Sequence, residues 1–144
     1  MKRSTIRKVE DILRDYPKLD KYIEQRESEL RYPMSQTDDN VGGGKSNYPD
    51  HDGPLRTLIT IDEDRKINAL KRQRDVIGDL LDECDKDTKT LIQELYFNRH
   101  PQFTIEGLVM NNYVEVSRRT AFKLKKEFIN ELAKALNLDI YDLD

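Results

Sequence analysis

The strongest chemical signal in the sequence is a run of cationic side chains between Ser117 and Lys126. The run contains five basic residues and no acidic one, although the whole chain has a formal net charge of -3. Guanidinium and ammonium groups neutralise phosphates, and arginine can also bind guanine edges in the major groove of DNA. Positive charge gathered in an acidic chain therefore indicates a local surface for nucleic acid.

A helix would bring these cations to one side. At about 100° per residue, Arg119, Lys123, Lys126 and Asn130 share one face, and the opposite face is apolar. Ser117 can cap this helix and leave its first amides free to meet a phosphate. Asn130 lies too far along the helix for a DNA contact to be assigned. We expect DNA contacts from Ser117, Arg118, Arg119, Thr120, Lys123 and Lys126. The alternative is an ordinary helix with a solvated charged face.

The residues before this helix favour DNA binding over that alternative. A short helix from Thr104 to about residue 111, a polar turn at 111–113 and a basic helix over 117–136 follow in the order of a helix-turn-helix. An earlier helix, capped by Asp87, leads into them. We expect their core to contain Phe97, Leu108, Phe128 and Leu132. Tyr113 and Phe122 are also expected to be core residues rather than stacking residues for single strands.

The whole chain is expected to be all-α. Residues 1–31 form a helical segment, with one helix capped by Ser4 and another beginning at Pro17. Residues 32–56 hold most of the glycines and form a flexible linker. Residues 57–84 form one long helix, residues 85–138 the helix-turn-helix domain, and residues 139–144 an acidic tail.

Two interpretations of the long helix remain open. Ile67, Leu70, Ile77, Leu81 and Cys84 have nearly heptad spacing, which allows pairing with a second copy as a homodimer. A polar residue at the missing position of this seam favours the other interpretation, a helix packed on its own chain.

Composition excludes several classes of protein. Hydrophobic residues make up 36% of the chain and charged residues 37%, which is enough for one modest core but not for an elaborate sheet enzyme. One cysteine and two histidines leave few residues for metal or nucleophilic chemistry. We see no membrane-spanning run and no secretory signal, so the expected location is the cytoplasm.

Other motifs in the chain have simpler explanations. The Gly42–Ser46 stretch resembles a phosphate-binding loop, but Asp39 stands where that motif requires a glycine. His51 lies between two aspartates in the expected linker, where a metal site would lack a rigid frame. Cys84 falls on an apolar stripe and is expected in the core. We therefore expect no cofactor, no metal and no enzymatic activity.

Several stretches together resemble a known family. Leu91–Arg99 (LIQELYFNR), Thr104–Glu106 (TIE) and Val116–Lys126 (VSRRTAFKLKK) are similar to the helix-turn-helix of sigma-factor region four. They are more similar to phage late-gene transcriptional activators of the RinA and ArpU type. Ser4–Pro17 (STIRKVEDILRDYP) and Thr37–Gly44 (TDDNVGGG), with Pro33 before it, also fit the RinA type. The connection from Thr104 to Ser117 is longer than the sigma-like spacing, which predicts a wider turn.

The resemblance implies binding to double-stranded phage DNA and activation of the late operon. A sigma-like shape also allows contact with host RNA polymerase. Two alternatives from other classes are a small terminase subunit that packages DNA and a helical adaptor whose basic face binds an acidic protein.

Overall fold

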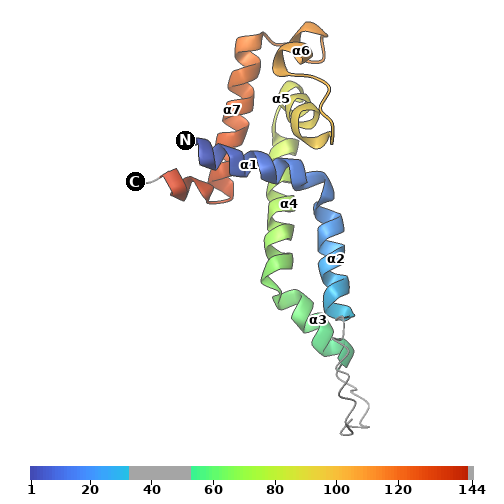
Figure 1. The fold of residues 1–144 in the computed structure, drawn as a ribbon. Helices are drawn as coiled ribbons and strands as arrows, with labels where there is room; N and C mark the ends of the chain where they lie inside the picture. Colours follow the sequence, from blue (N-terminus) through green and yellow to red (C-terminus); the bar gives the residue numbers. More distant parts are fainter. Residues whose placement is uncertain (33–52, 143–144) are drawn as a thin grey trace, which may run out of the picture.

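The computed structural model describes residues 1–32 and 53–142, and within these ranges it is all-α with no strand. The predicted all-α class is therefore confirmed (Figure 1). Most of the predicted linker, including Gly42–Ser46 and His51, lies outside the described residues. The elements are α1 (Arg3–Asp15), the 3-10 turn η1 (Tyr16–Lys18), α2 (Leu19–Arg31), α3 (Gly53–Glu63), α4 (Arg65–Glu83), α5 (Lys86–Ile92), the π-helix η2 (Gln93–Phe97), α6 (Ile105–Met110), α7 (Arg118–Ala135) and the 3-10 turn η3 (Leu138–Asp142).

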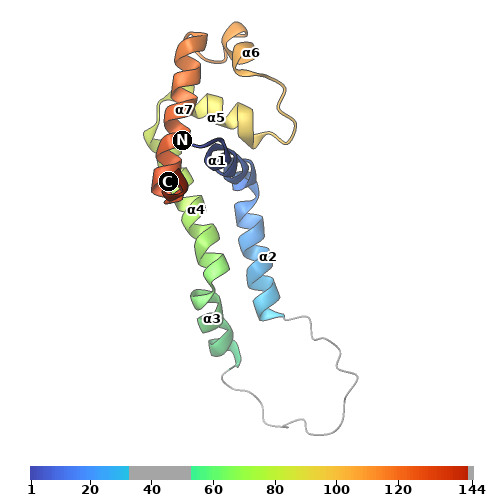
Figure 2. The same cartoon turned by 60° about the vertical axis from the view of Figure 1, so that its left-hand side comes forward.

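The helices form a stalk and a head. In the stalk, α2 packs along α4, and α3 continues the line of α4 (Figures 1 and 2). In the head, α7 packs on α5 and α6. The first helix connects the two parts, because α1 crosses α4 and contacts α7, η2 and η3.

The largest hydrophobic cluster joins the two ends of the chain. Val9 and Leu13 from α1 pack with Ile77 from α4 and with Phe128 and Leu132 from α7. All of these side chains are at most 4% exposed. The predicted division between a helical segment at 1–31 and a separate domain at 85–138 therefore needs correction, because α1 is part of the core of the C-terminal half.

The core residues expected from sequence are only partly correct. Leu108, Phe128 and Leu132 are buried as predicted. Phe97 is half-buried and stacks on Tyr16, with ring centroids 5.0 Å apart. Tyr113 and Phe122 were expected in the core, but they are 49% and 40% exposed.

The predicted single helix over 57–84 is wrong, because the chain breaks at Asp64. This residue has an extended backbone (φ -66°, ψ 118°), and its side chain accepts a hydrogen bond from the Ile67 amide at 2.9 Å. The Arg26 guanidinium of α2 donates to the other carboxylate oxygen at 3.0 Å. Asp64 therefore ends α3, caps α4 and connects both to α2.

The apolar stripe of α4 packs within the chain. Ile67 lies in a small cluster with Ile23 of α2 and Ile61 of α3, whereas Ile77 and Leu81 belong to the large cluster with α1 and α7. Intramolecular packing, the favoured interpretation, is confirmed. The stripe from Ile67 to Leu81 is consequently not available as the interface of a homodimer.

Two predicted caps are also corrected. Asp85, rather than Asp87, caps α5 by accepting a hydrogen bond from the Thr88 amide. The residue before α1 is Lys2, rather than Ser4, and it provides no side-chain cap. Thr104 and Ser117 cap α6 and α7 as expected.

The predicted acidic tail is in fact folded over 138–142 as η3. The Asp142 carboxylate accepts hydrogen bonds from the Lys2 amide at 3.0 Å and the Thr5 hydroxyl at 2.9 Å. Because Thr5 is fully buried, this carboxylate satisfies a polar group inside the structure.

Asp64 makes the joint between α3 and α4 sensitive to acid. The hydrogen bond from Arg26 is the main reason why the pKa of Asp64 lies below its ordinary value of 3.8. Since the folded pKa is below the unfolded one, the stabilisation is complete above about pH 4 and is lost as the pH falls through the folded pKa. We predict that Asp64→Asn, which keeps a capping side chain, loses less stability than the wild type between about pH 6 and about pH 3. Urea unfolding at each pH measures this difference, and parallel pH curves for the two proteins would contradict it.

Candidate nucleic-acid interface

The turn that presents α7 begins with a capped helix end. At the end of α6, the Asn112 amide donates to the Val109 carbonyl, and the Tyr113 amide donates to the Leu108 carbonyl at 3.0 Å. Asn112 itself has φ 60°, a left-handed conformation that asparagine tolerates better than most residues. These are the two hydrogen bonds of a Schellman motif, so α6 ends sharply and the chain turns toward α7.

The connection over 111–117 is held at two further points. Val114 is 3% exposed and packs in a second hydrophobic cluster with Leu91, Leu108 and Ala121. The Glu115 amide donates to the Asp87 carboxylate at 3.2 Å. This hydrogen bond gives Asp87 a role at the turn in place of the predicted cap. These two contacts anchor the long connection to α5 through Asp87 and to the second hydrophobic cluster through Val114.

The first residues of α7 use their hydroxyl groups locally. The Ser117 hydroxyl oxygen accepts from the Thr120 amide at 3.2 Å, and the Ser117 hydroxyl donates to the Thr120 hydroxyl at 3.0 Å. Ser117 is therefore occupied by its cap, whereas the Thr120 hydroxyl hydrogen is left to donate elsewhere. Because no acidic side chain lies in the first turn, the positive end of α7 is not neutralised there.

Most of the predicted cations extend into solvent from α7. Arg119 and Lys126 are exposed and have no ion-pair partner among residues 1–32 and 53–142. The Lys123 ammonium lies 3.9 Å from the Glu127 carboxylate one turn along, and both side chains are more than half exposed. Such a pair is weak and opens readily. Arg119, Lys123 and Lys126 therefore form an accessible cationic face, which we call the α7 face.

Arg118 differs from these three cations because it is tied to α6. Its Nε donates to the Glu106 carboxylate at 3.0 Å, and its guanidinium carbon lies 5.0 Å from the centre of the Phe122 ring. The pKa of Glu106 is lowered mainly by its own backbone amide and then by Arg118. The pair orients Arg118 toward α6 in this structure.

A shallow groove beside the α7 face was not foreseen from sequence. It has a volume of about 370 Å³ and lies between the start of α1 and the side of α7 that carries Phe122, Lys125 and Lys126. Ile6 of α1 and Ile129 of α7 also line it. Phe122 is partly exposed because its ring lines this open groove. Only the long-range packing of α1 on α7 creates the groove, and a pattern within one helix cannot show such packing.

Cys84, the other residue considered for chemistry, is partly buried and hydrogen-bonded within the helical core. The Cys84 thiol is half-buried, donates to the Leu81 carbonyl at 3.2 Å, and has its pKa raised mainly by burial. A raised pKa lowers the fraction of reactive thiolate. Within the part of the chain that the structure describes, no group of three or more metal-ligating side chains is present. In the same part, no helix is both long and apolar enough to cross a bilayer.

Comparison with known proteins agrees with the resemblance seen in the sequence. Residues 5–134 match a family described as a protein of unknown function (DUF722). The chain is also 31% identical over 141 residues to the "Transcriptional activator rinA" of Staphylococcus phage phi11. The aligned region covers 96% of this chain and 95% of that protein. The chain belongs to the RinA family. No solved structure matches it. Because the match covers 96% of this chain, it includes residues of both α1 and α7.

Asn112 offers a test of the turn that presents α7. We predict that Asn112→Gly keeps full stability, because glycine adopts positive φ freely. Asn112→Ala is expected to cost about 1 kcal/mol, because alanine carries a Cβ but lacks the short polar side chain with which asparagine tolerates a left-handed conformation. Urea unfolding of both variants measures the difference, and equal losses would show that this backbone angle is not a constraint.

Proposed function

We propose that the chain is a DNA-binding transcriptional activator of phage late genes, and that α7 is its recognition helix. The observation that carries this proposal is the α7 face, three accessible cations on one side of a helix that follows α6 and an anchored turn. The name of the phage phi11 relative supports the activator part. The resemblance to a sigma-like helix-turn-helix suggests the mode of docking.

In this proposal the beginning of α7 enters the major groove. Arg119 lies in the first turn of α7 and, in this proposal, binds a base edge or a phosphate. Lys123 and Lys126 neutralise phosphates farther along the groove. Arg118, directed by Glu106, and the hydroxyl of Thr120 add phosphate contacts at the rim, and the amides next to Ser117 face a phosphate at the helix end.

The proposal also includes the location of the protein and its binding partners. The protein acts in the cytoplasm, where it binds double-stranded DNA and contacts host RNA polymerase, without a cofactor and without catalysing a reaction. A surface of α2, α3 or α4 is available for a partner, because the stalk extends away from α7 (Figure 2).

Charge reversal on the α7 face tests the assignment. We predict that Arg119→Glu with Lys123→Glu abolishes binding to the operator duplex, a loss of at least about a hundredfold. Helicity should stay unchanged, because both side chains are exposed and leave the core intact. A fluorescence titration with labelled duplex measures affinity, and circular dichroism measures helicity.

A matched variant separates a local effect from a change in net charge. Lys21→Glu with Arg31→Glu makes the same change in charge on exposed residues of α2. It should keep the affinity within about threefold. Wild-type affinity in the α7 variant, or equal losses in both variants, would show that α7 is not the recognition helix.

Salt dependence tests the phosphate contacts separately. Three or four cations on phosphates give a slope of about -3 to -4 for the logarithm of the binding constant against the logarithm of the salt concentration. Lys126→Gln is expected to make that slope shallower by about 1 and to weaken binding to operator and unrelated duplexes alike. A slope that is flat in the wild type would contradict phosphate binding.

A further inference from the structure

A second cationic site lies at the other end of α1. The end of α1, the turn η1 and the end of η2 surround a pocket of about 230 Å³. Tyr96 and Phe97 provide its aromatic lining, and Pro17 and Pro101 restrict the backbone on its two sides. Because Phe97 also stacks on Tyr16, this lining is held in place by the core.

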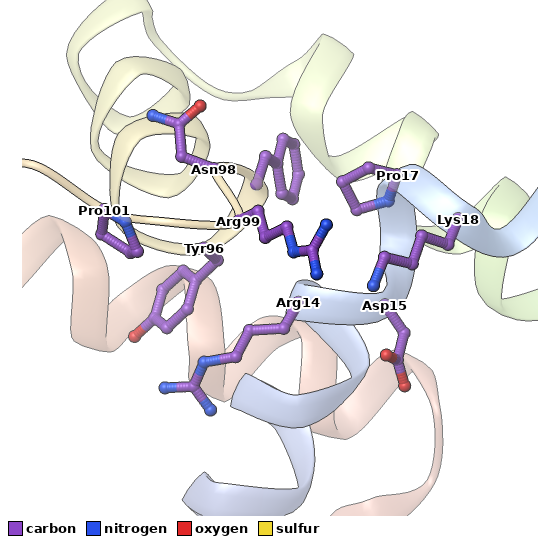
Figure 3. Close-up of a pocket in the computed structure, with 9 residues that line it drawn as sticks. Arg14, Asp15, Pro17, Lys18, Tyr96, Asn98, Arg99 and Pro101 are labelled. Atoms are coloured by element: carbon purple, nitrogen blue, oxygen red, sulfur yellow. The ribbon is translucent and has the colours of Figure 1, made fainter.

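Two cations share this pocket without an ion-pair partner. Lys18 and Arg99 both extend into the space between η1 and the end of η2, whereas the Asp15 carboxylate points away from it (Figure 3). Within the described ranges neither cation forms an ion pair. Arg14, also at the pocket, is already occupied, since it pairs with Asp11 at 3.0 Å and lies over the Tyr96 ring. Like charges in one hollow repel each other, and an anion bound between them removes that repulsion.

The local backbone explains how Arg99 reaches the pocket. The helix that begins as α5 widens into a π-helix over 93–97 and ends at Asn98, whose backbone is extended. Arg99 therefore leaves the helix axis instead of continuing along it. Single π turns of this kind occur frequently at functional sites.

We propose that this pocket binds carboxylate side chains of an acidic segment in a protein partner. A guanidinium binds a carboxylate through paired hydrogen bonds, and the ammonium of Lys18 adds a second charge. The aromatic lining can pack against the methylene groups that precede a carboxylate. A concave site of this size accepts a protruding side chain, whereas the backbone of a duplex is broad and convex.

The pocket lies at the opposite end of α1 from the groove beside the α7 face. The start of α1 lies at α7 and its end lies at α2 in both views (Figures 1 and 2). The 13 residues of α1 span about 20 Å, but Tyr96 of the pocket lies close to α7, with its ring centre 5.9 Å from the Lys125 ammonium. The concave shape and the two cations, unpaired within the described residues, favour a protein partner, and duplex binding at the pocket is an outcome of the test below. For an activator, an acidic segment of the transcription machinery is such a partner, but the inference does not depend on DNA binding by α7.

Hexaglutamate is a suitable probe for the full-length chain. We expect its titration, followed by nuclear magnetic resonance, to shift the backbone amides of Phe97 and Asn98 and the Nε–H signal of Arg99. Lys18→Gln with Arg99→Gln should lose the shifts at Phe97 and Asn98 and weaken binding at least about tenfold. The variant should melt no lower than the wild type, because the removed charges repel each other in the free protein.

Two control variants make the result specific. Lys21→Gln with Arg31→Gln removes the same charge from α2 and should keep the affinity for hexaglutamate within about twofold. Arg119→Gln with Lys123→Gln should keep the shifts at Phe97, Asn98 and Arg99 while weakening duplex binding. This second control distinguishes failure of the pocket from failure of the proposed DNA-binding function.

Three outcomes would overturn the inference. The first is unchanged hexaglutamate binding in the variant of Lys18 and Arg99. The second is peptide shifts confined to α7. The third is a loss of duplex affinity in the pocket variant together with duplex-induced shifts at Arg99, which would assign the pocket to DNA.

Discussion

Burial of one side of α7 is the constraint on which the rest of the structure depends. Ala121 packs in the cluster of the α6–α7 turn, whereas Phe128 and Leu132 pack with α1 and α4. Each large apolar side chain buried in this way contributes about 1.5–3 kcal/mol. The exposed ion pairs of Arg118 and Lys123 contribute far less. Hydrophobic packing therefore fixes the orientation of α7, and the cations on its other side are available for binding.

The same packing gives the N-terminal helix a role that extends beyond its own segment. Because α1 lies against α7 and η2, it contributes to the groove near Phe122 and to the pocket near Arg99. Tyr96 lies between the groove and the pocket, since it lines the pocket and is close to Lys125 of the groove. Its hydroxyl donates to Glu10 of α1 at 2.7 Å, and Arg14 and Lys125 both lie within 6 Å of its ring centre. Burial and the nearby carboxylate raise the pKa of Tyr96, so it remains a neutral hydrogen-bond donor.

Periodicity predicted the helices well because each one carries its own apolar stripe. Thr104 and Ser117 were recognisable as caps, and the cationic residues of α7 lie on the face that the helical projection assigned to them. Periodicity failed where a local choice depends on distant residues. Asp64 interrupts an otherwise continuous helical pattern because Arg26 is placed to bind it. The pocket of Lys18 and Arg99 combines residues far apart in the chain, so no local sequence motif predicts it.

The contact between Thr5 and Asp142 has a consequence for the order in which the protein is completed. These residues are 137 positions apart, and the partners of α1 in the large cluster include the last helix. During synthesis, α1 leaves the ribosome first but cannot complete the burial of its apolar side until α7 has emerged. The stalk helices can pair earlier, because α2 and α4 are closer in sequence. Assembly of the head is therefore completed late, and a chain that stops before α7 leaves Val9 and Leu13 without the part of their packing that Phe128 and Leu132 supply.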